Sequence, residues 1–146
     1  MANTSFGDVF DIAIWKFRDR DLVEFNEADR DAILGVHLLS ASSHALAVTG
    51  DSSFDIDYKR QSFKTELTNE QMDIVATGIA YEWYNRKVLN SETIRNRLSN
   101  KDYSNHSPGT LLEAMVKLRD QLKYEWDVKL IEYSMRYGDV SKWTAQ

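Results

Sequence analysis

The feature that most constrains the fold of this chain is a long periodic run from Ser107 to Gly138. Ser107 can cap free amide groups at a helix start, and Pro108 fits the first helical position, where no amide hydrogen is needed. Gly138 follows the last periodic residue, at a place where a residue that tolerates positive φ ends a helix. The run therefore predicts one helix of roughly 45 Å, at a rise of about 1.5 Å per residue.

The apolar residues of this run recur at steps of mostly three and four, which places them on one face of a helix. They are Leu111, Leu112, Met115, Leu118, Leu122, Trp126, Leu130, Tyr133 and Tyr137. We expect this face to pack on the rest of the domain. A helix of this length must span the domain or protrude from it.

Composition favours a single all-α domain over residues 1–146, a helical bundle with a long C-terminal helix. The chain has 146 residues, 42% of them hydrophobic, which is enough for one domain with a proper core. One proline and six glycines leave few turns for a many-stranded sheet. We expect residues 139–146 to be a flexible tail.

Two further features bear on the compartment. The chain has no cysteine, which excludes disulfides and thiolate zinc sites and fits a reducing cytosol. The N-terminus has neither a basic region nor an apolar core, and we expect no membrane-spanning segment. The chain is therefore expected to be soluble and not exported.

Four more helices are predicted before the long one. Residues 5–18 carry an apolar stripe at steps of three and four, and Trp15 lies off that stripe. A second helix is expected from the cap Asn26 to about Ala47, with an apolar face and small residues that allow a close helix neighbour. The first stripe is Phe6, Val9, Phe10, Ala13, Ile14 and Phe17; the second face is Ala28, Ala32, Ile33, Val36, Leu39, Leu46 and Ala47, and its small residues are Ala41, Ser42 and Ser43.

A capping box of Thr68 and Gln71 predicts the start of a third helix that runs to about Lys87. A short helix is expected to follow from Asn90 or Ser91, with Ile94 and Leu98 facing inward. The stripe of the third helix is suited to pack on the C-terminal helix. It consists of Met72, Val75, Ala76, Ile79, Ala80, Trp83 and Tyr84.

The periodic pattern breaks between residues 48 and 67, which we interpret as an irregular arm. Phe54, Ile56 and Tyr58 alternate with charged residues, which is typical of a short strand. The aromatic residues either tuck back onto the domain or form an arm that lies on a neighbouring subunit. The subunit-interface candidates are Phe54, Ile56, Tyr58, Phe63, Tyr133 and Tyr137.

Two motifs could indicate a metal site, but one fails on residue spacing and the other on residue identity. His37 and His44 are seven residues apart on a helix, about 10.5 Å along its axis, too far to share one ion. Residues 51–57 carry alternating oxygen ligands, as in a calcium loop. The loop glycine is replaced by Ile56 and its final glutamate by Ser62, so the match fails.

No catalytic motif stands out either. His106 has Asp102, Ser104 and Ser107 nearby, but a triad normally converges from separate elements, and these groups better suit local capping hydrogen bonds. We therefore predict no catalytic, cofactor-binding or metal-ligating residues, and a protein that is not an enzyme and needs no cofactor.

Charge is uneven along the chain. Residues 1–73 hold seven Lys and Arg against fourteen Asp and Glu, a difference of −7, whereas residues 74–146 hold eleven against nine, a difference of +2. Neither half supplies the basic cluster that neutralises phosphates. Tight binding to DNA is therefore disfavoured.

Three segments together resemble the neck proteins of tailed bacteriophages, the head–tail connector or adaptor family. They are FGDVFDIAIWKFRDRDLVEF, FKTELTNEQMDIVATGIAYEWYNRKV and RNRLSNKDYSNHSPGTLLEAMVKLRDQLKYEWDVKLIEYSMRYGD, and they span nearly the whole chain. The most specific part of the resemblance is the run from Asn100 to Pro108.

The resemblance implies an all-α virion protein of the neck that is assembled in the host cytoplasm. Copies of it would form a ring, twelve-fold as in the family, that docks on the portal protein at the capsid vertex. Downstream neck and tail proteins would follow, and DNA would pass through without sequence-specific binding; no membrane is involved. Two alternatives stay open: another neck role, such as a stopper or tail-completion protein, and a non-viral module that binds a partner helix between the third and last helices.

Overall fold

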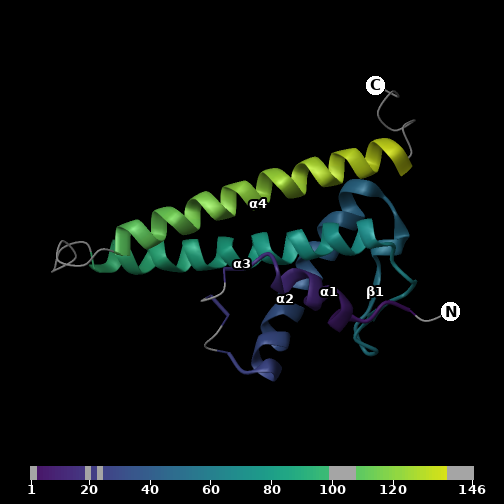
Figure 1. The fold of residues 1–146 in the computed structure, drawn as a ribbon, viewed down its shortest axis with the longest axis horizontal. Helices are drawn as coiled ribbons and strands as arrows, with labels where there is room; N and C mark the ends of the chain where they lie inside the picture. Colours follow the sequence, from purple (N-terminus) through teal and green to yellow (C-terminus); the bar gives the residue numbers. More distant parts are fainter. Residues whose placement is uncertain (1–2, 19–20, 23–24, 99–107, 138–146) are drawn as a thin grey trace.

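The long axis of the molecule is a pair of antiparallel helices, α3 (Asn69–Leu98) and α4 (Pro108–Tyr137), each of 30 residues, which lie side by side (Figure 1). The computed structural model describes residues 3–18, 21–22, 25–98 and 108–137. α1 (Phe6–Ile14) and α2 (Glu27–Thr49) pack across one side of this pair. The predicted all-α architecture with a long C-terminal helix is confirmed.

α4 begins at Pro108 as predicted, while Ser107, Gly138 and the tail lie outside the described residues. Its predicted stripe is largely correct, because Leu122, Trp126 and Leu130 are buried. Tyr137, the last member, is exposed. The side chain of Leu111 lies outside the described part.

α3 starts at the predicted capping box. The amide of Thr68 donates to Gln71 Oε1 at 2.8 Å, and the amide of Gln71 donates to Thr68 Oγ1 at 3.2 Å. The prediction of a separate short helix from Asn90 or Ser91 is wrong, because α3 continues to Leu98. No glycine or proline interrupts the chain between residues 79 and 98, so the helical hydrogen bonds are not broken there.

α1 ends four residues before the predicted end, and the chain leaves it in tight turns. The amide of Lys16 donates to the carbonyl of Ala13, and that of Phe17 to the carbonyl of Ile14. Phe17 is still buried, against Trp83 and Tyr84. Trp15 lies off the buried face, as predicted.

α2 is capped by Asn26, whose side chain accepts from the amide of Asp29, and it ends at Gly50 with φ of 70°. Its predicted apolar face is wrong, because those side chains are exposed or only partly buried. Residues 32–49 contain no Asp, Glu, Lys or Arg, so the apolar pattern does not single out one face. The buried face consists of Leu34, Leu38, Ala41, Ser42, Ala45 and Thr49.

The same composition makes α2 long and apolar enough to cross a membrane by length and hydropathy, contrary to our expectation that no segment would be. This is weak evidence for a membrane span, because core helices of soluble proteins pass the same test. Here Leu34, Leu38 and Ala45 belong to the main core cluster with residues of α1 and α3.

Three helices converge at Gly78 of α3. A Cβ atom at this position would lie 2.6 Å from Cζ2 of Trp126 and 2.8 Å from Cβ of Ala41. The absence of a side chain therefore lets α2 and α4 approach α3 together. The small residue predicted on α2 as a site of close helix contact is confirmed at Ala41.

Residues 51–67 fold back onto the domain. A short 3₁₀ helix, η1 (Ser52–Phe54), is followed by an antiparallel hairpin of β1 (Ile56–Asp57) and β2 (Ser62–Phe63), in which Ile56 pairs with Phe63. Phe54 therefore lies in this 3₁₀ helix and not in the predicted strand. Thr4 secures the segment: its backbone oxygen accepts from the amide of Phe63, and its Oγ1 accepts from the amide of Leu67 at 2.7 Å.

Candidate docking surfaces

Three of the six predicted interface residues are core residues. Phe54 is 1% exposed and packs edge-on against the ring of Tyr133, with centroids 5.5 Å apart. Phe63 packs in the same way against Phe6 at 5.8 Å. Phe54, Phe63 and Tyr133 thus have almost no surface for a neighbouring subunit, because the folded segment buries them within its own domain.

The other three candidates are more accessible. Ile56 is half-buried against the core. Tyr58, between β1 and β2, is 62% exposed, and Tyr137, at the end of α4, is similarly exposed. Of the predicted set, only Tyr58 and Tyr137 can offer a large apolar surface to a partner.

The hydroxyl of Tyr133 joins the 51–67 segment to α3 and α4. It accepts from Gln71 Nε2 at 2.8 Å and donates to the carboxylate of Asp51. Burial opposes the charge of Asp51, but hydrogen bonds from Tyr133 and Ser53 outweigh it and lower the pKa of Asp51. Burial and the bond to Asp51 raise the pKa of Tyr133 to about 12. The Asp51 carboxylate thus serves the fold and is not a free ligand.

Two further polar groups hold the N-terminal part against α3. Asp73 pairs with Lys129 of α4 and, at 2.8 Å, with Lys16 beyond α1. The hydroxyl of Tyr84 donates to the carboxylate of Asp21, and burial and this bond raise the pKa of Tyr84 to about 12. These contacts fix α1, α3 and α4 as one scaffold for the surfaces outside it.

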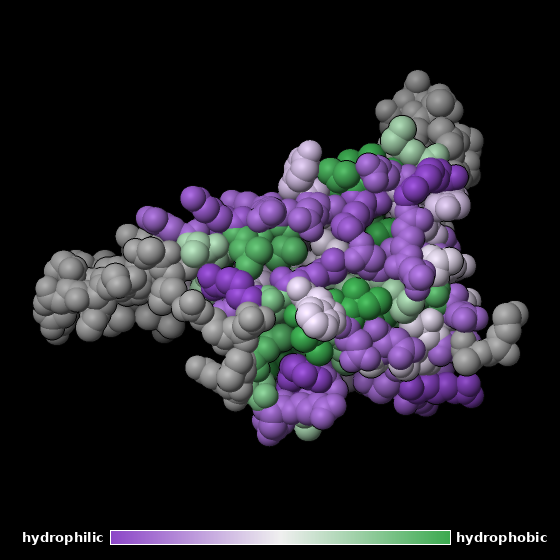
Figure 2. Space-filling view, viewed as in Figure 1, coloured by the Kyte–Doolittle hydropathy of each residue, from purple (hydrophilic) through white to green (hydrophobic). Residues whose placement is uncertain are grey.

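The outer face of α4 carries an apolar row, which we call the α4 stripe: the exposed Tyr124, Ile131 and Met135 and the half-buried Val128. These residues are spaced by four, three and four, so they lie on one side of the helix, away from the buried row. Tyr124 is 72% and Met135 67% exposed. Figure 2 shows apolar side chains on the outer edge of α4 toward its C-terminal end, beside a polar face.

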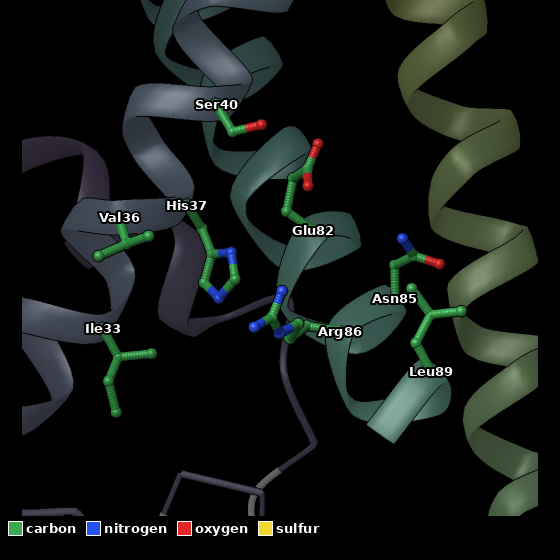
Figure 3. A pocket seen from close by; sticks show the side chains of 8 residues that line it. All are labelled: Ile33, Val36, His37, Ser40, Glu82, Asn85, Arg86 and Leu89. Carbon is green, nitrogen blue, oxygen red and sulfur yellow. The ribbon is translucent and has the colours of Figure 1, made fainter. Parts of the chain in front are cut away.

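A hollow of about 440 Å³ lies between α2 and α3, and we call it the α2–α3 hollow (Figure 3). The side chain of Arg86 reaches toward the half-buried ring of His37, and Glu82 and Ser40 lie at the other end. Burial and the charge of Arg86 lower the pKa of His37. Its lining residues are Ile33, Val36, His37, Ser40, Glu82, Asn85, Arg86 and Leu89.

Among the described residues, Trp15 is the large hydrophobic side chain with the greatest exposure, at 89%. Asp8 and Asp11 precede it by seven and four residues and are also exposed, so they lie on the same side of α1. We call these three residues the Trp15 face.

His44, the other histidine of α2 considered as a metal ligand, lies in different surroundings from His37. His44 lies on the ring of Trp126, with centroids 4.7 Å apart. Among the described residues, no group of three or more His, Cys, Asp or Glu side chains could hold a metal ion. His106 and its neighbours lie outside the described part.

The remaining carboxylates of the calcium-like run are also engaged. Asp55 pairs with Lys64 at 2.8 Å, and Asp57 lies 3.7 Å from Arg60. The hydrogen bond from Lys64 lowers the pKa of Asp55. These groups bridge the two arms of the hairpin and its turn.

The α4 stripe and the α2–α3 hollow were not predicted. The spacing of Tyr124, Ile131 and Met135 is visible in the sequence, but it falls among the charged residues of the outer face. The hollow depends on the rotation of α2, which its uniform composition does not reveal. Comparisons with protein families, curated proteins and solved structures find no match for this chain.

Proposed function

We propose that this chain is a structural protein of the bacteriophage neck, which forms a ring on the portal protein and extends the DNA channel toward the tail. The sequence resemblance supplies the class of protein. The observation that carries the proposal in the structure is the α4 stripe, a solvent-facing apolar row on a helix whose opposite face is fixed in the core.

The α4 stripe suits a lasting protein contact. Its members extend over about 16 Å of a helix, at ~1.5 Å per residue. A row of large apolar side chains on a soluble protein marks a surface that another protein covers. We assign this surface to the portal protein, because a rigid helix can present it without a folding step on binding.

A ring also needs two different surfaces that meet between neighbouring copies. The Trp15 face, the α2–α3 hollow and the hairpin with Tyr58 belong to different elements and are available for this purpose. The net charge of −5 suits a conduit in which phosphates must not be held. Asp and Glu on the inner face of the ring are expected; an inner face lined with Lys and Arg would contradict this part of the proposal.

The test is co-expression with the portal protein encoded in the same genome, followed by sedimentation of the complex. Replacing Tyr124 and Ile131 with Glu should lower portal affinity by at least about tenfold, because it places two charges in an apolar contact. Helix content and unfolding midpoint should stay near the wild-type values, since both side chains are exposed. Ala28→Glu, an exposed change on α2, is the control and should bind normally.

Three results would count against the proposal. Wild-type binding by the stripe variant would show that α4 is not the docking surface. No binding of the wild-type chain to the portal protein would remove the neck function itself. A loss of portal affinity in Ala28→Glu as large as that in the stripe variant would show that any added negative charge weakens the complex.

The α2–α3 hollow favours a second candidate, a helical module that binds a peptide. The expected groove between the third and last helices is closed along its middle, where Trp126 packs at Gly78. The hollow lies instead between α2 and α3. A chain that stays monomeric and binds a helical peptide in this hollow would support the module over the ring.

A further inference from the structure

We propose that the α2–α3 hollow receives Trp15 of a second copy of this chain, and that Asp11 of that copy pairs with Arg86. This contact specifies how copies would meet in the proposed neck function. It rests on that function, because the closure of copies into a ring comes from it. It joins the exposed Trp15 face to the α2–α3 hollow.

The Trp15 face has the shape and charge of a donor. At 89% exposure, the indole of Trp15 has almost no contact with its own domain. Tryptophan is enriched among the residues that anchor protein contacts, because it removes a large apolar area from water. Within the described part of the chain, neither Asp8 nor Asp11 forms an ion pair, so the indole is accompanied by two free negative charges.

The α2–α3 hollow has the matching properties. Its volume of about 440 Å³ is in the range of pockets that admit a small molecule, and therefore an indole. Ile33 and Val36 give it an apolar wall, and Val36 is itself exposed. Among the described residues, Arg86 pairs with no carboxylate, and its guanidinium lies at the hollow beside His37 (Figure 3).

Charge selects Asp11 as the companion of Trp15. Burial and the nearby Arg86 lower the pKa of His37, which keeps the imidazole neutral and leaves Arg86 as the cation of the hollow. Glu82 lies at the opposite end, near Ser40, and would repel an acid placed there. An incoming carboxylate is therefore directed to the end with Arg86.

The two surfaces belong to different parts of one chain and share no residue, so the contact can repeat from copy to copy. Each copy uses its Trp15 face on one neighbour and its hollow on the other, which generates a ring if the rotation closes. This contact thus supplies the repeated interface that an adaptor ring requires.

The experiment measures self-association by sedimentation up to about millimolar concentration, and ring formation on the portal protein. Trp15→Ala should weaken self-association at least about tenfold. It cannot act by unfolding the domain, because the side chain is exposed. Val48→Ala, which shortens another exposed apolar side chain that belongs neither to the Trp15 face nor to the hollow, is the control and should associate like the wild type.

A charge exchange tests the pairing. Asp11→Arg and Arg86→Asp should each weaken association, whereas one chain that carries both changes restores an ion pair at every contact and should return to within about threefold of the wild type. Failure of the double variant to recover would overturn the assigned pair. Normal association of Trp15→Ala would overturn the whole contact.

The outcomes separate this inference from the neck function. Portal-bound rings that persist in Trp15→Ala would refute the contact and leave the neck function standing. Association that needs Trp15 and recovers in the double variant, without portal binding, would support the contact and refute the neck function. A wild-type chain that neither associates nor binds the portal protein would refute both.

Discussion

Gly78→Ala should destabilise the fold although alanine is the better helix former. The new Cβ would lie 2.6 Å and 2.7 Å from two ring atoms of Trp126 and 2.8 Å from Cβ of Ala41. Trp126 cannot easily move aside, because its ring packs between His44 at 4.7 Å and Tyr81 at 5.7 Å. The added methyl group must therefore push α2 or α4 away from α3.

The size of the effect follows from two opposing contributions. Overpacking a tight core costs about 1–3 kcal/mol. Replacing glycine by alanine within a helix stabilises it by about 0.8–1.0 kcal/mol. Because Trp126 and Ala41 block the methyl group on two sides, we expect an overpacking cost in the upper part of its range. The net loss in the free energy of unfolding should then be about 1–2 kcal/mol. Since urea slopes for small domains are ~1–3 kcal/mol per molar, the midpoint should fall by roughly 1 M.

Gly35→Ala is the matched control. Gly35 also lies inside a helix, but its added Cβ would meet only Cζ of Phe10, at an ordinary contact distance of 3.9 Å. This variant should gain up to about 1 kcal/mol, because only the helix preference changes. If Gly78→Ala is as stable as Gly35→Ala in urea, the three helices do not converge at Gly78.

Three other predictions concern the core and the 51–67 segment. Trp126→Ala should lower the free energy of unfolding by about 3–5 kcal/mol, and a loss below about 1 kcal/mol in urea would show that its face of α4 is exposed. Phe54→Ser should destabilise by about 3 kcal/mol or more, whereas Tyr58→Ser should stay within about 0.5 kcal/mol; equal effects would mean that Phe54 is not buried. The pKa values of Tyr84 and Tyr133, raised to about 12, give stability that is complete below the ordinary pKa of 10 and lost as the pH rises toward 12. Urea midpoints between pH 9 and 12 should therefore fall less steeply for the variant with both tyrosines changed to Phe, and an unchanged slope would contradict the buried hydrogen bonds.

Helix starts were predictable because their chemistry is local. Asn26 caps α2, and Thr68 with Gln71 forms the capping box of α3, as the residue types and spacing indicate. The face of α4 was predictable for a related reason: charged residues on one side leave a single apolar row. Both signals lie within a few turns of chain.

Features that depend on distant residues were not predictable in this way. The buried face of α2 follows from its fit to Gly78 and Trp126, and a helix without charged residues from 32 to 49 gives no pattern to choose it. The 51–67 segment folds inward because Tyr133 of α4 meets Phe54 and Asp51, 79 and 82 residues away. For the same reason, Tyr58 is the only large aromatic side chain of the predicted arm that is exposed.

The proposed neck function requires that copies of this chain assemble on a portal protein. The mass of the complex between the wild-type chain and the portal protein encoded in the same genome, measured by native mass spectrometry, tests it most directly. We expect one closed complex in which a fixed number of copies is bound, equal to the number of portal subunits. A portal protein that keeps its own mass, with the chain remaining a separate monomer, would contradict it.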